Sequence, residues 1–501
     1  MASSPRRGAR PAVIATPAPT ARTIPPASTR PEPSRQPRRA ALAVVVAAGL
    51  VAVSCGRPSG QTEQGGGDQS SSSTTAGGSG TGPGDFGTLE GLCRGGNAGG
   101  STAQGVTSDS IKIATFSDIG FAGRPGLNQE LFDAAEVFSK WCNAAGGING
   151  RKIVVQERDA KLFEYKQRVI ESCAEDFMMV GGGGVFDDTG QNERLRCLLP
   201  DIAGYVVQPK ARGADLEVQS VPSPLNAQSI GVYQYLARRF PGSGSAVGYL
   251  TGNIPATLTV KNQAQEAAKQ GLGFKTVYDE RYTPTGEATW TPFAQGMKTK
   301  GVKGLVYVGE PENLAKLEQA MASVGFTPQW VVAGPNNYDQ ILVKTGGGAV
   351  KRTFMQVNFV PFEEASKSPA LQQYLDLFAR YKPSGKARAV LGVQAFSAWL
   401  IFAKAAGACG ANLTRRCVYD NAKKLRDWNA GGLSAPQRVD QQKTSQCYTV
   451  VEASGDGFDV MDVKPTDGLF RCDPKSVVTL KGDYGTGARL ADVGRSMSDL
   501  K

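Results

Sequence analysis

An α/β fold, in which parallel sheets are flanked by helices, is predicted from residue 106 onward by the alternation of apolar runs and helical stretches. The run IKIATF (111–116) has the length of a strand and is followed by a polar loop. Strand, loop and helix in this order form the first unit of a parallel sheet. The helix is predicted because apolar residues recur with the spacing of one helix face at Leu127, Leu131, Ala134, Ala135, Phe138, Trp141 and Ala145.

The stretch NAAGGINGRKIVV (143–155) is predicted to end this helix and begin the second strand. Gly146 or Gly147 can adopt the left-handed conformation that closes a helix, because glycine has no Cβ atom. Asn149-Gly150 is a strong turn dipeptide, and KIVV (152–155) then starts an apolar run. A helix and a strand can therefore be joined here by very few residues.

The same alternation continues along the chain and indicates further βαβ units. Strands are predicted at the runs MMVGGGGV (178–185), IAGYVV (202–207), SAVGYL (245–250), GLVYVG (304–309) and WVVAG (330–334). Helices are predicted to begin near Tyr165, Gln191, Asn226, Thr257, Pro311 and Asp339.

The net charge of +11 over 501 residues does not indicate a nucleic-acid partner, because most of it lies in the leader. Residues 1–54 hold eight arginines and one glutamate, whereas residues 55–501 hold 48 basic and 44 acidic residues. A phosphate-binding surface needs basic charge clustered on the folded part of the chain.

Residues 1–54 have the layout of an export signal: a basic stretch is followed by the uncharged run AALAVVVAAGLVAVS (40–54). This run has fifteen residues, fewer than the roughly 20 that a membrane-spanning helix needs. Its end, AVSC, resembles the lipobox of bacterial lipoproteins, which predicts that Cys55 is lipidated and becomes the mature N-terminus. An ordinary signal with an incidental cysteine is the alternative. Residues 55–105 are rich in Gly and Ser and are predicted to be a disordered tether.

The remaining eight cysteines are predicted to form four disulfides, as is usual for an even number in an exported protein. Sequence proximity favours the local pairs Cys409–Cys417 and Cys447–Cys472, then Cys173–Cys197. This choice leaves Cys93 for Cys142.

Catalysis is not expected, because the chain contains no histidine. The absence of histidine excludes Ser-His-Asp and Cys-His catalysis and the common zinc motifs. Asp456, Asp459 and Asp462 lack the alternating spacing of a calcium loop, and a hairpin turning at 455–457 is the preferred interpretation. We therefore expect no enzyme activity, metal or cofactor.

GVTSDSIKIATFSD (105–118) and AAEVFSKWCNAAGGINGRKIVVQERDAK (134–161) closely resemble the opening of periplasmic type I solute-binding proteins, in particular the lipoproteins of branched-chain amino-acid-type ABC importers. The likeness extends over about 105–465. It implies two α/β lobes, each a parallel sheet flanked by helices, joined by three hinge crossovers at VPSPLN (221–226), VNFVPF (357–362) and APQRVD (435–440). Lobe 1 would hold 106–223 and 359–437, lobe 2 would hold 224–358 and 438–472, and 473–501 would be a C-terminal tail.

Ligands of open α/β sheets bind beyond the carboxyl ends of the strands, and the family binds its ligand with these loops. Asp187 and Asp188 stand where amino-acid binders of the family carry hydroxyl residues, so either these aspartates face solvent or the ligand carries a cationic or donor group. Thr189 could donate to the ligand or cap a helix. The expected site consists of Ser117, Asp118, Phe186, Asp187, Asp188, Thr189, Gln208, Glu310, Asn336, Asn337 and Tyr338.

Together, these observations predict an exported, monomeric, lipid-anchored solute receptor on the outer face of the cytoplasmic membrane. It would capture a small polar ligand, such as an amino-acid-like amide or amine, and deliver it to the permease of an ABC importer. The membrane would be contacted only through the lipid anchor. A lipid-anchored sensor or regulatory lipoprotein on the same fold is the alternative, which fold alone cannot separate.

Overall fold

The computed structural model of this protein describes residues 82–455 and 457–501. The predicted signal peptide (1–54), the lipidated Cys55 and the tether up to residue 81 lie outside the described residues.

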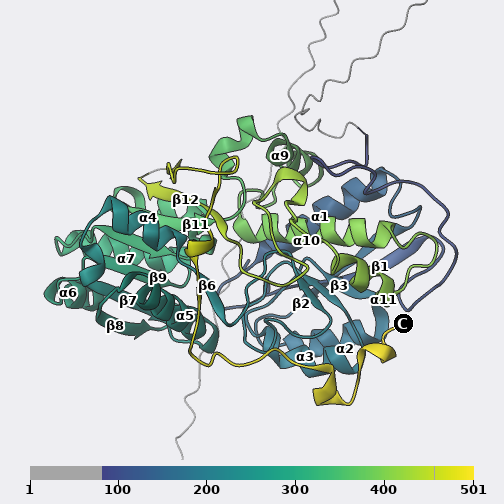
Figure 1. Cartoon of the computed structure of the whole chain (residues 1–501), viewed down its shortest axis with the longest axis horizontal. Helices are drawn as coiled ribbons and strands as arrows, with labels where there is room; N and C mark the ends of the chain where they lie inside the picture. The colour runs from purple at the N-terminus through teal and green to yellow at the C-terminus, as the bar shows by residue number, and fades with distance from the viewer. Residues whose placement is uncertain (1–81, 456) are drawn as a thin grey trace, which may run out of the picture. The chain divides into compact units, whose positions relative to one another are not determined.

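Five strands, all parallel, form the first sheet in the order β2-β1-β3-β4-β5. Three of them, β1, β2 and β3, are labelled in Figure 1. Ile111 and Ile113 of β1 belong to the core shared with α1, whereas Phe116 packs with Tyr165 of α2 on the opposite face. The strands are β1 (Ser110–Ser117), β2 (Lys152–Asp159), β3 (Met178–Val180), β4 (Asp201–Ala203) and β5 (Glu217–Gln219). We call this sheet and its helices lobe 1.

Six helices belong to lobe 1, and α10 lies at its centre beside α1. Although α10 is long and apolar enough to cross a membrane, it is a core helix here, because almost all of its side chains are buried against the sheet and neighbouring helices. The helices are α1 (Gln129–Ala144), α2 (Tyr165–Glu175), α3 (Gln191–Arg196), α9 (Pro369–Tyr381), α10 (Val390–Gly407) and α11 (Arg415–Ala422).

The predicted turn between α1 and β2 is confirmed. Gly146, Gly147 and Gly150 have φ angles of 109°, 76° and 90°, and Asn149 has 50°, all in the left-handed region. A Cβ atom on Gly147 would lie 2.1 Å from the carbonyl oxygen of Arg151, so no other residue fits there without moving the backbone.

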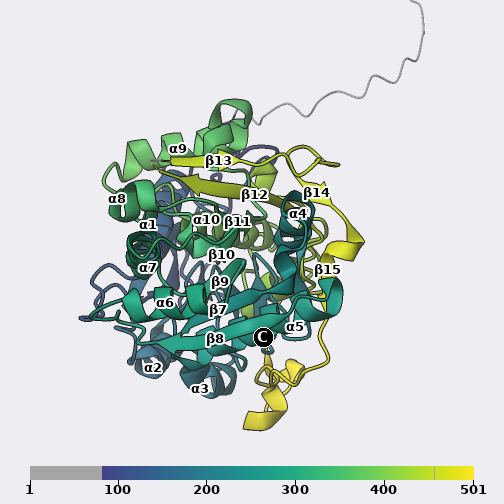
Figure 2. The same ribbon diagram turned by 90° about the vertical axis from the view of Figure 1, so that its left-hand side faces the viewer.

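The second sheet has the order β13-β12-β11-β10-β9-β7-β8, which Figure 2 shows as a stack of strands. The strands from β8 to β11 are parallel, but β12 pairs antiparallel with β11 and with β13. Ser454 lies opposite Gly457, as the predicted hairpin requires. The bounds are β7 (Val247–Gly252), β8 (Thr276–Tyr282), β9 (Gly304–Val308), β10 (Trp330–Ala333), β11 (Thr353–Val357), β12 (Cys447–Ser454) and β13 (Gly457–Val460).

Five helices flank this second sheet, and together they form what we call lobe 2. Most predicted helix starts agree with the structure within two residues, but the start near Asn226 is wrong, because β6 (Ala227–Ser229) occupies that segment. The helices are α4 (Gly231–Arg239), α5 (Pro255–Leu272), α6 (Thr291–Thr299), α7 (Pro311–Ser323) and α8 (Gln340–Gly346).

The chain passes between the two sheets after β5, after β11 and before β12. Residues 473–501, predicted as a tail, make a further connection that we call the C-terminal strap. β15 (Val477–Thr479) pairs with β6, and Leu480 packs in the core of lobe 2. Beyond it, Leu490 packs against Leu195 of lobe 1, and the Asp215 amide donates to the Ala488 carbonyl (2.9 Å; Figure 1).

The prediction of a disordered tether up to residue 105 is wrong for residues 82–105. Phe86 is fully buried against Trp141 and Phe396, with ring centroids 6.1 and 5.1 Å away. Cys93 is joined to Cys142 of α1. The apolar residues of this stretch therefore bury their surface in lobe 1, although Gly and Ser surround them in sequence.

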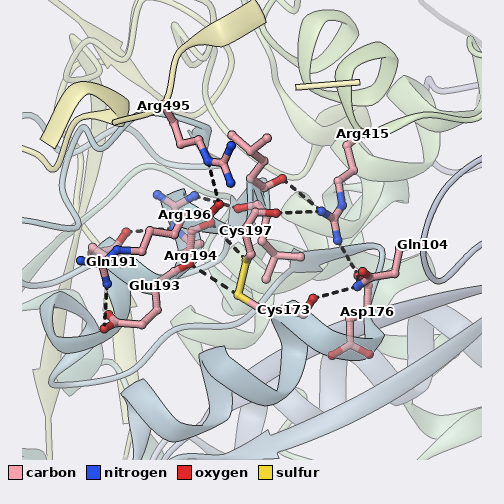
Figure 3. The surroundings of a disulfide bond; sticks show 12 residues. Gln104, Cys173, Asp176, Gln191, Glu193, Arg194, Arg196, Cys197, Arg415 and Arg495 are labelled. Atoms are coloured by element: carbon pink, nitrogen blue, oxygen red, sulfur yellow. Dashed lines mark hydrogen bonds and ion pairs between the residues drawn. A yellow bond between two sulfur atoms is a disulfide. The ribbon is translucent and has the colours of Figure 1, made fainter. Parts of the chain in front are cut away.

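All four predicted disulfides are confirmed: Cys93–Cys142, Cys173–Cys197, Cys409–Cys417 and Cys447–Cys472. Figure 3 shows the Cys173–Cys197 bond, which joins α2 to the end of α3, and the half-buried Arg415 near it. This guanidinium donates to four backbone carbonyl groups, those of Asp176, Phe177, Cys197 and Leu198. The C-terminal strap also contacts the end of α3 beside this disulfide, because Arg495 donates to the Arg196 carbonyl (3.2 Å).

Candidate functional site

A cavity of about 410 Å³ lies between lobe 1 and lobe 2. Its volume falls in the range of pockets that hold small molecules. Lobe 1 contributes the segment 203–207 after β4 and two residues of α10, and the first passage between the lobes contributes Val221 and Ser223. Lobe 2 contributes the ends of β9, β10 and β11 with the residues that follow them, and one face each of α4 and α5. The cavity therefore lies at the carboxyl ends of strands, as in other open α/β proteins.

Two of the eleven predicted site residues, Glu310 and Asn336, line this cavity. Both lie in lobe 2, directly after β9 and after β10. The other nine predicted residues do not line the cavity.

Asp187 is almost fully buried and holds one wall of the cavity in place. Its carboxylate accepts hydrogen bonds from the backbone amides of Val207 (2.8 Å) and Gln208 (3.0 Å). Burial raises the pKa of Asp187 well above its ordinary value, and these two amide donors oppose that rise. Asp187 therefore shapes the cavity only indirectly, by holding the backbone of the 205–208 loop.

Asp188 and Thr189 lie beside it but do not reach the cavity. Asp188 is half-buried, and Thr189 is exposed and donates to the Phe186 carbonyl (2.8 Å). Phe186 stacks on Phe163 with ring centroids 5.5 Å apart. Asp187 and Asp188, on which the expectation of a cationic ligand depended, therefore do not line the cavity.

Ser117 and Asp118 connect loops of lobe 1. The Ser117 hydroxyl donates to the Asn128 carbonyl (2.8 Å), and Asp118 accepts from the amides of Leu162 and Val185 (both 2.9 Å). In the same way, Gln208 donates to the Val185 carbonyl (3.1 Å).

The predicted residues of lobe 2 shape the loop after β10. The amide groups of Asn336 and Asn337 both donate to the Gly309 carbonyl, at 3.0 and 3.2 Å. Tyr338 is buried, hydrogen-bonded to Glu363 and stacked on Phe359. Asn336 alone of these three side chains lines the cavity.

Arg124 joins the two lobes at the cavity and was not predicted from the sequence. It lies in the loop after β1, and its guanidinium contacts Glu310 (2.8 Å) and Glu312 (2.9 Å) at the start of α7. Burial alone would lower the pKa of Arg124, but the two carboxylates raise it above its ordinary value. An isolated arginine in a polar loop carries no sequence signal of this contact, which depends on how the lobes meet.

Arg212 and a group of amide side chains also line the cavity and were missed. Arg212 follows the 205–208 loop and is 3% exposed. The amides are Gln219, Gln228, Gln263, Gln356, Asn358 and Gln394. Three of these, at 219, 228 and 358, lie in or beside the passages between the lobes, so the concentration of amides near those segments was an available signal.

Comparisons with known proteins agree with this geometry. The fatty acid ABC transporter substrate-binding protein from Thermomonospora curvata is 16% identical over 76% of this chain and 97% of that chain, with a TM-score of 0.63. A branched-chain amino acid ABC transporter from Thermus thermophilus with bound valine is 15% identical over 70% and 96%, with a TM-score of 0.57. For the branched-chain amino acid transporter substrate-binding protein from Streptococcus pneumoniae in complex with isoleucine, the values are 16%, 70% and 99%, and 0.54. No curated protein matches the chain significantly.

These structures share the two-lobed type I fold with this protein, at identities too low to carry more than the fold. The sequence profile of the family described as "Periplasmic binding protein" matches residues 201–458, which is more than half of the chain. The chain therefore belongs to the periplasmic binding protein family.

Proposed function

We propose that this protein is an extracytoplasmic solute-binding lipoprotein that captures a small ligand between its lobes and delivers it to the permease of an ABC importer. The observation that carries the proposal is the cavity of about 410 Å³ whose wall is shared by both lobes. A ligand in such a cavity stabilises the state in which the lobes meet, because it contacts both of them.

The ion pairs of Arg124 with Glu310 and Glu312 support the same mechanism. They join the loop after β1 to the first turn of α7, so they exist only while the lobes are together. Glu310 also lines the cavity, so a ligand bound there would lie beside the ion pair. The ion pair and the ligand would therefore favour the same closed state.

Thermal unfolding of the purified protein with a panel of small metabolites tests this function. A compound present at one hundred times its dissociation constant should add about 2.7 kcal/mol to the free energy of unfolding. Arg124→Gln should bind the same compound more weakly, whereas Arg281→Gln, an exposed change on β8, should bind it as wild type does. The proposal fails if no metabolite stabilises the protein.

We also propose that Cys55 carries the lipid that anchors the protein to the outer face of the cytoplasmic membrane. Its position directly after the apolar run supports this role. Cys55→Ser should release the protein into the medium, which fractionation of expressing cells would detect. A variant that remains with the membranes as wild type does would place the anchor elsewhere.

A further inference from the structure

The cavity wall contains only two charged residues among the described part of the chain, Arg212 and Glu310. They are not equivalent. Glu310 already has an ion-pair partner, because Arg124 contacts it at 2.8 Å, although Arg124 is shared with Glu312. Arg212 is therefore the one charged residue on the wall that has no ion-pair partner among the described residues.

The Arg212 guanidinium makes three hydrogen bonds within the protein and has further N–H groups without an acceptor among the described residues. Its guanidinium donates to the carbonyl groups of Ser223 (2.8 Å) and Pro224 (2.9 Å) and to the side chain of Gln263 (2.8 Å). A guanidinium has five N–H groups, so two of them have no acceptor within residues 82–455 and 457–501. Within the same residues, Arg212 forms no ion pair with a carboxylate.

The charge of Arg212 persists at neutral pH although it is buried. Burial lowers the pKa of Arg212 to about 10, so the group stays protonated. The acidic groups that face it are Asp187 and Glu217. Burial raises the pKa of Glu217 to about 8, so this group does not balance the charge fully at pH 7. The Asp187 carboxylate already accepts from the backbone amides of Val207 and Gln208 and forms no ion pair with Arg212. A buried charge without a counter-ion is unfavourable, and an anionic ligand would remove that cost.

Position distinguishes Arg212 from other arginines whose guanidinium groups donate to the backbone. Arg151, Arg194 and Arg415 also donate to backbone carbonyl groups and form no ion pair among the described residues. None of these three lines the cavity. Hydrogen bonds to carbonyl groups alone therefore do not indicate that an arginine binds a ligand. The feature that distinguishes Arg212 is its place on the cavity wall.

Most of the remaining wall near the strands is apolar. Nine valines contribute to it: Val206, Val207, Val221, Val232, Val260, Val306, Val308, Val332 and Val357. Such a surface favours a hydrocarbon body over a strongly hydrated one.

Given the solute-binding function proposed above, we propose that the ligand is an amphipathic carboxylate: a hydrocarbon chain or ring that packs on the valines, with one carboxylate that accepts from Arg212. The one carboxylate on the wall, Glu310, already contacts Arg124, so an ammonium group would have to compete with that arginine for it. We therefore expect an α-amino acid to bind more weakly than the acid without the amino group.

Calorimetric titration of the full chain with octanoate, octanamide and leucine tests this assignment. Octanamide has the shape of octanoate without its charge, so a charge-assisted hydrogen bond to Arg212 should make octanoate bind at least ten-fold more tightly. Leucine should also bind at least ten-fold more weakly than octanoate. Equal binding of octanoate and octanamide, preferred binding of leucine, or no binding of octanoate would each overturn the ligand class.

Arg212→Gln tests the residue itself. The variant should bind octanoate and octanamide equally, and Arg281→Gln should keep the preference of wild type. If Arg212→Gln retains that preference, another group reads the carboxylate. A crystal structure of the wild-type protein with octanoate gives the same answer without a variant, because a carboxylate outside hydrogen-bonding distance of Arg212 would contradict the proposal. If octanoate fails but another metabolite stabilises the protein, the ligand class is wrong and the solute-binding function stands.

Discussion

Asp187 acts on the cavity through the backbone that it holds. Its carboxylate accepts from two buried amides, Val207 N and Gln208 N, in the loop that precedes Arg212. Asp187→Ala would leave both donors without an acceptor, at a cost of about 1–3 kcal/mol for each. We expect a lower melting temperature and, because the loop shifts, weaker ligand binding as well.

Asp188→Ala is the matched control for this change, because Asp188 is half-buried and its side chain accepts no hydrogen bond within the described residues. Its stability should change by less than about 0.5 kcal/mol. If Asp187→Ala lost ligand binding while keeping the melting temperature of wild type, Asp187 would be a ligand contact after all.

Glu318 on α7 is a buried acid outside the cavity, and it makes stability depend on pH. It is 2% exposed, accepts from the Thr353 hydroxyl (2.5 Å), and its other oxygen has no partner among the described residues. Burial raises its pKa from 4.5 to about 8. Between these two values the folded state binds a proton that the unfolded state releases, so stability falls as the pH rises.

Glu318→Gln removes this titration and keeps the shape of the side chain and its acceptor for Thr353. Compared with wild type, the variant should gain about 4 kcal/mol in the free energy of unfolding at pH 8 and little at pH 4.5. Urea unfolding at both pH values measures the difference. Glu280→Gln, an exposed change on β8, should show no such dependence; a Glu318→Gln variant without it would mean that the carboxyl is ionised in the fold.

At the scale of elements, the segment 82–105 is part of the core of lobe 1. Phe86 is fully buried between α1 and α10, where it contacts Trp141 and Phe396. Phe86→Ala should therefore reduce the free energy of unfolding by about 3–5 kcal/mol. Glu90→Ala, an exposed change four residues away, should have almost no effect. A loss below about 1 kcal/mol for Phe86→Ala would mean that this segment contributes little to the fold.

Several elements could be predicted from the sequence because the information is local. The glycines at 146, 147 and 150, the strand runs and three of the four disulfide pairs depend on residues that are close in the chain. The pair Cys93–Cys142 followed because these two cysteines were left over. Phe86 was missed because its partners lie 55 and 310 residues away, and the surrounding Gly and Ser conceal one buried aromatic. β6 was missed because its partner β15 belongs to the strap.

The site was harder to predict than the fold for the same reason. The loops after β9 and β10 were correctly expected to reach the cavity, since carboxyl ends of parallel strands share one edge. Whether a polar residue in such a loop turns toward the ligand or toward a neighbouring amide depends on the loop's own conformation, as Asp187 demonstrates. Arg124 and Arg212 gain their roles from contacts with lobe 2, which no local pattern records.

At the scale of the whole molecule, the lobes are joined by three passages of the chain, by the C-terminal strap and by the Arg124 ion pairs. The strap contacts the segment that carries Arg212, because the Ala488 amide donates to the Lys210 carbonyl (2.9 Å). The covalent connections persist when the lobes separate, whereas the Arg124 ion pairs do not. In the proposed mechanism, we therefore expect the cavity to open by separation of the lobes about the three passages.

The central claim is that this cavity holds one small molecule, and native mass spectrometry after equilibration with a bacterial metabolite extract tests it most directly. Ala264 on α5 lines the cavity, so Ala264→Phe should fill part of it, whereas Lys269→Phe changes an exposed position of the same helix. We predict one small-molecule adduct per chain on wild type and on Lys269→Phe, and none on Ala264→Phe. A wild-type protein without an adduct, or an Ala264→Phe protein with the same adduct, would contradict the account.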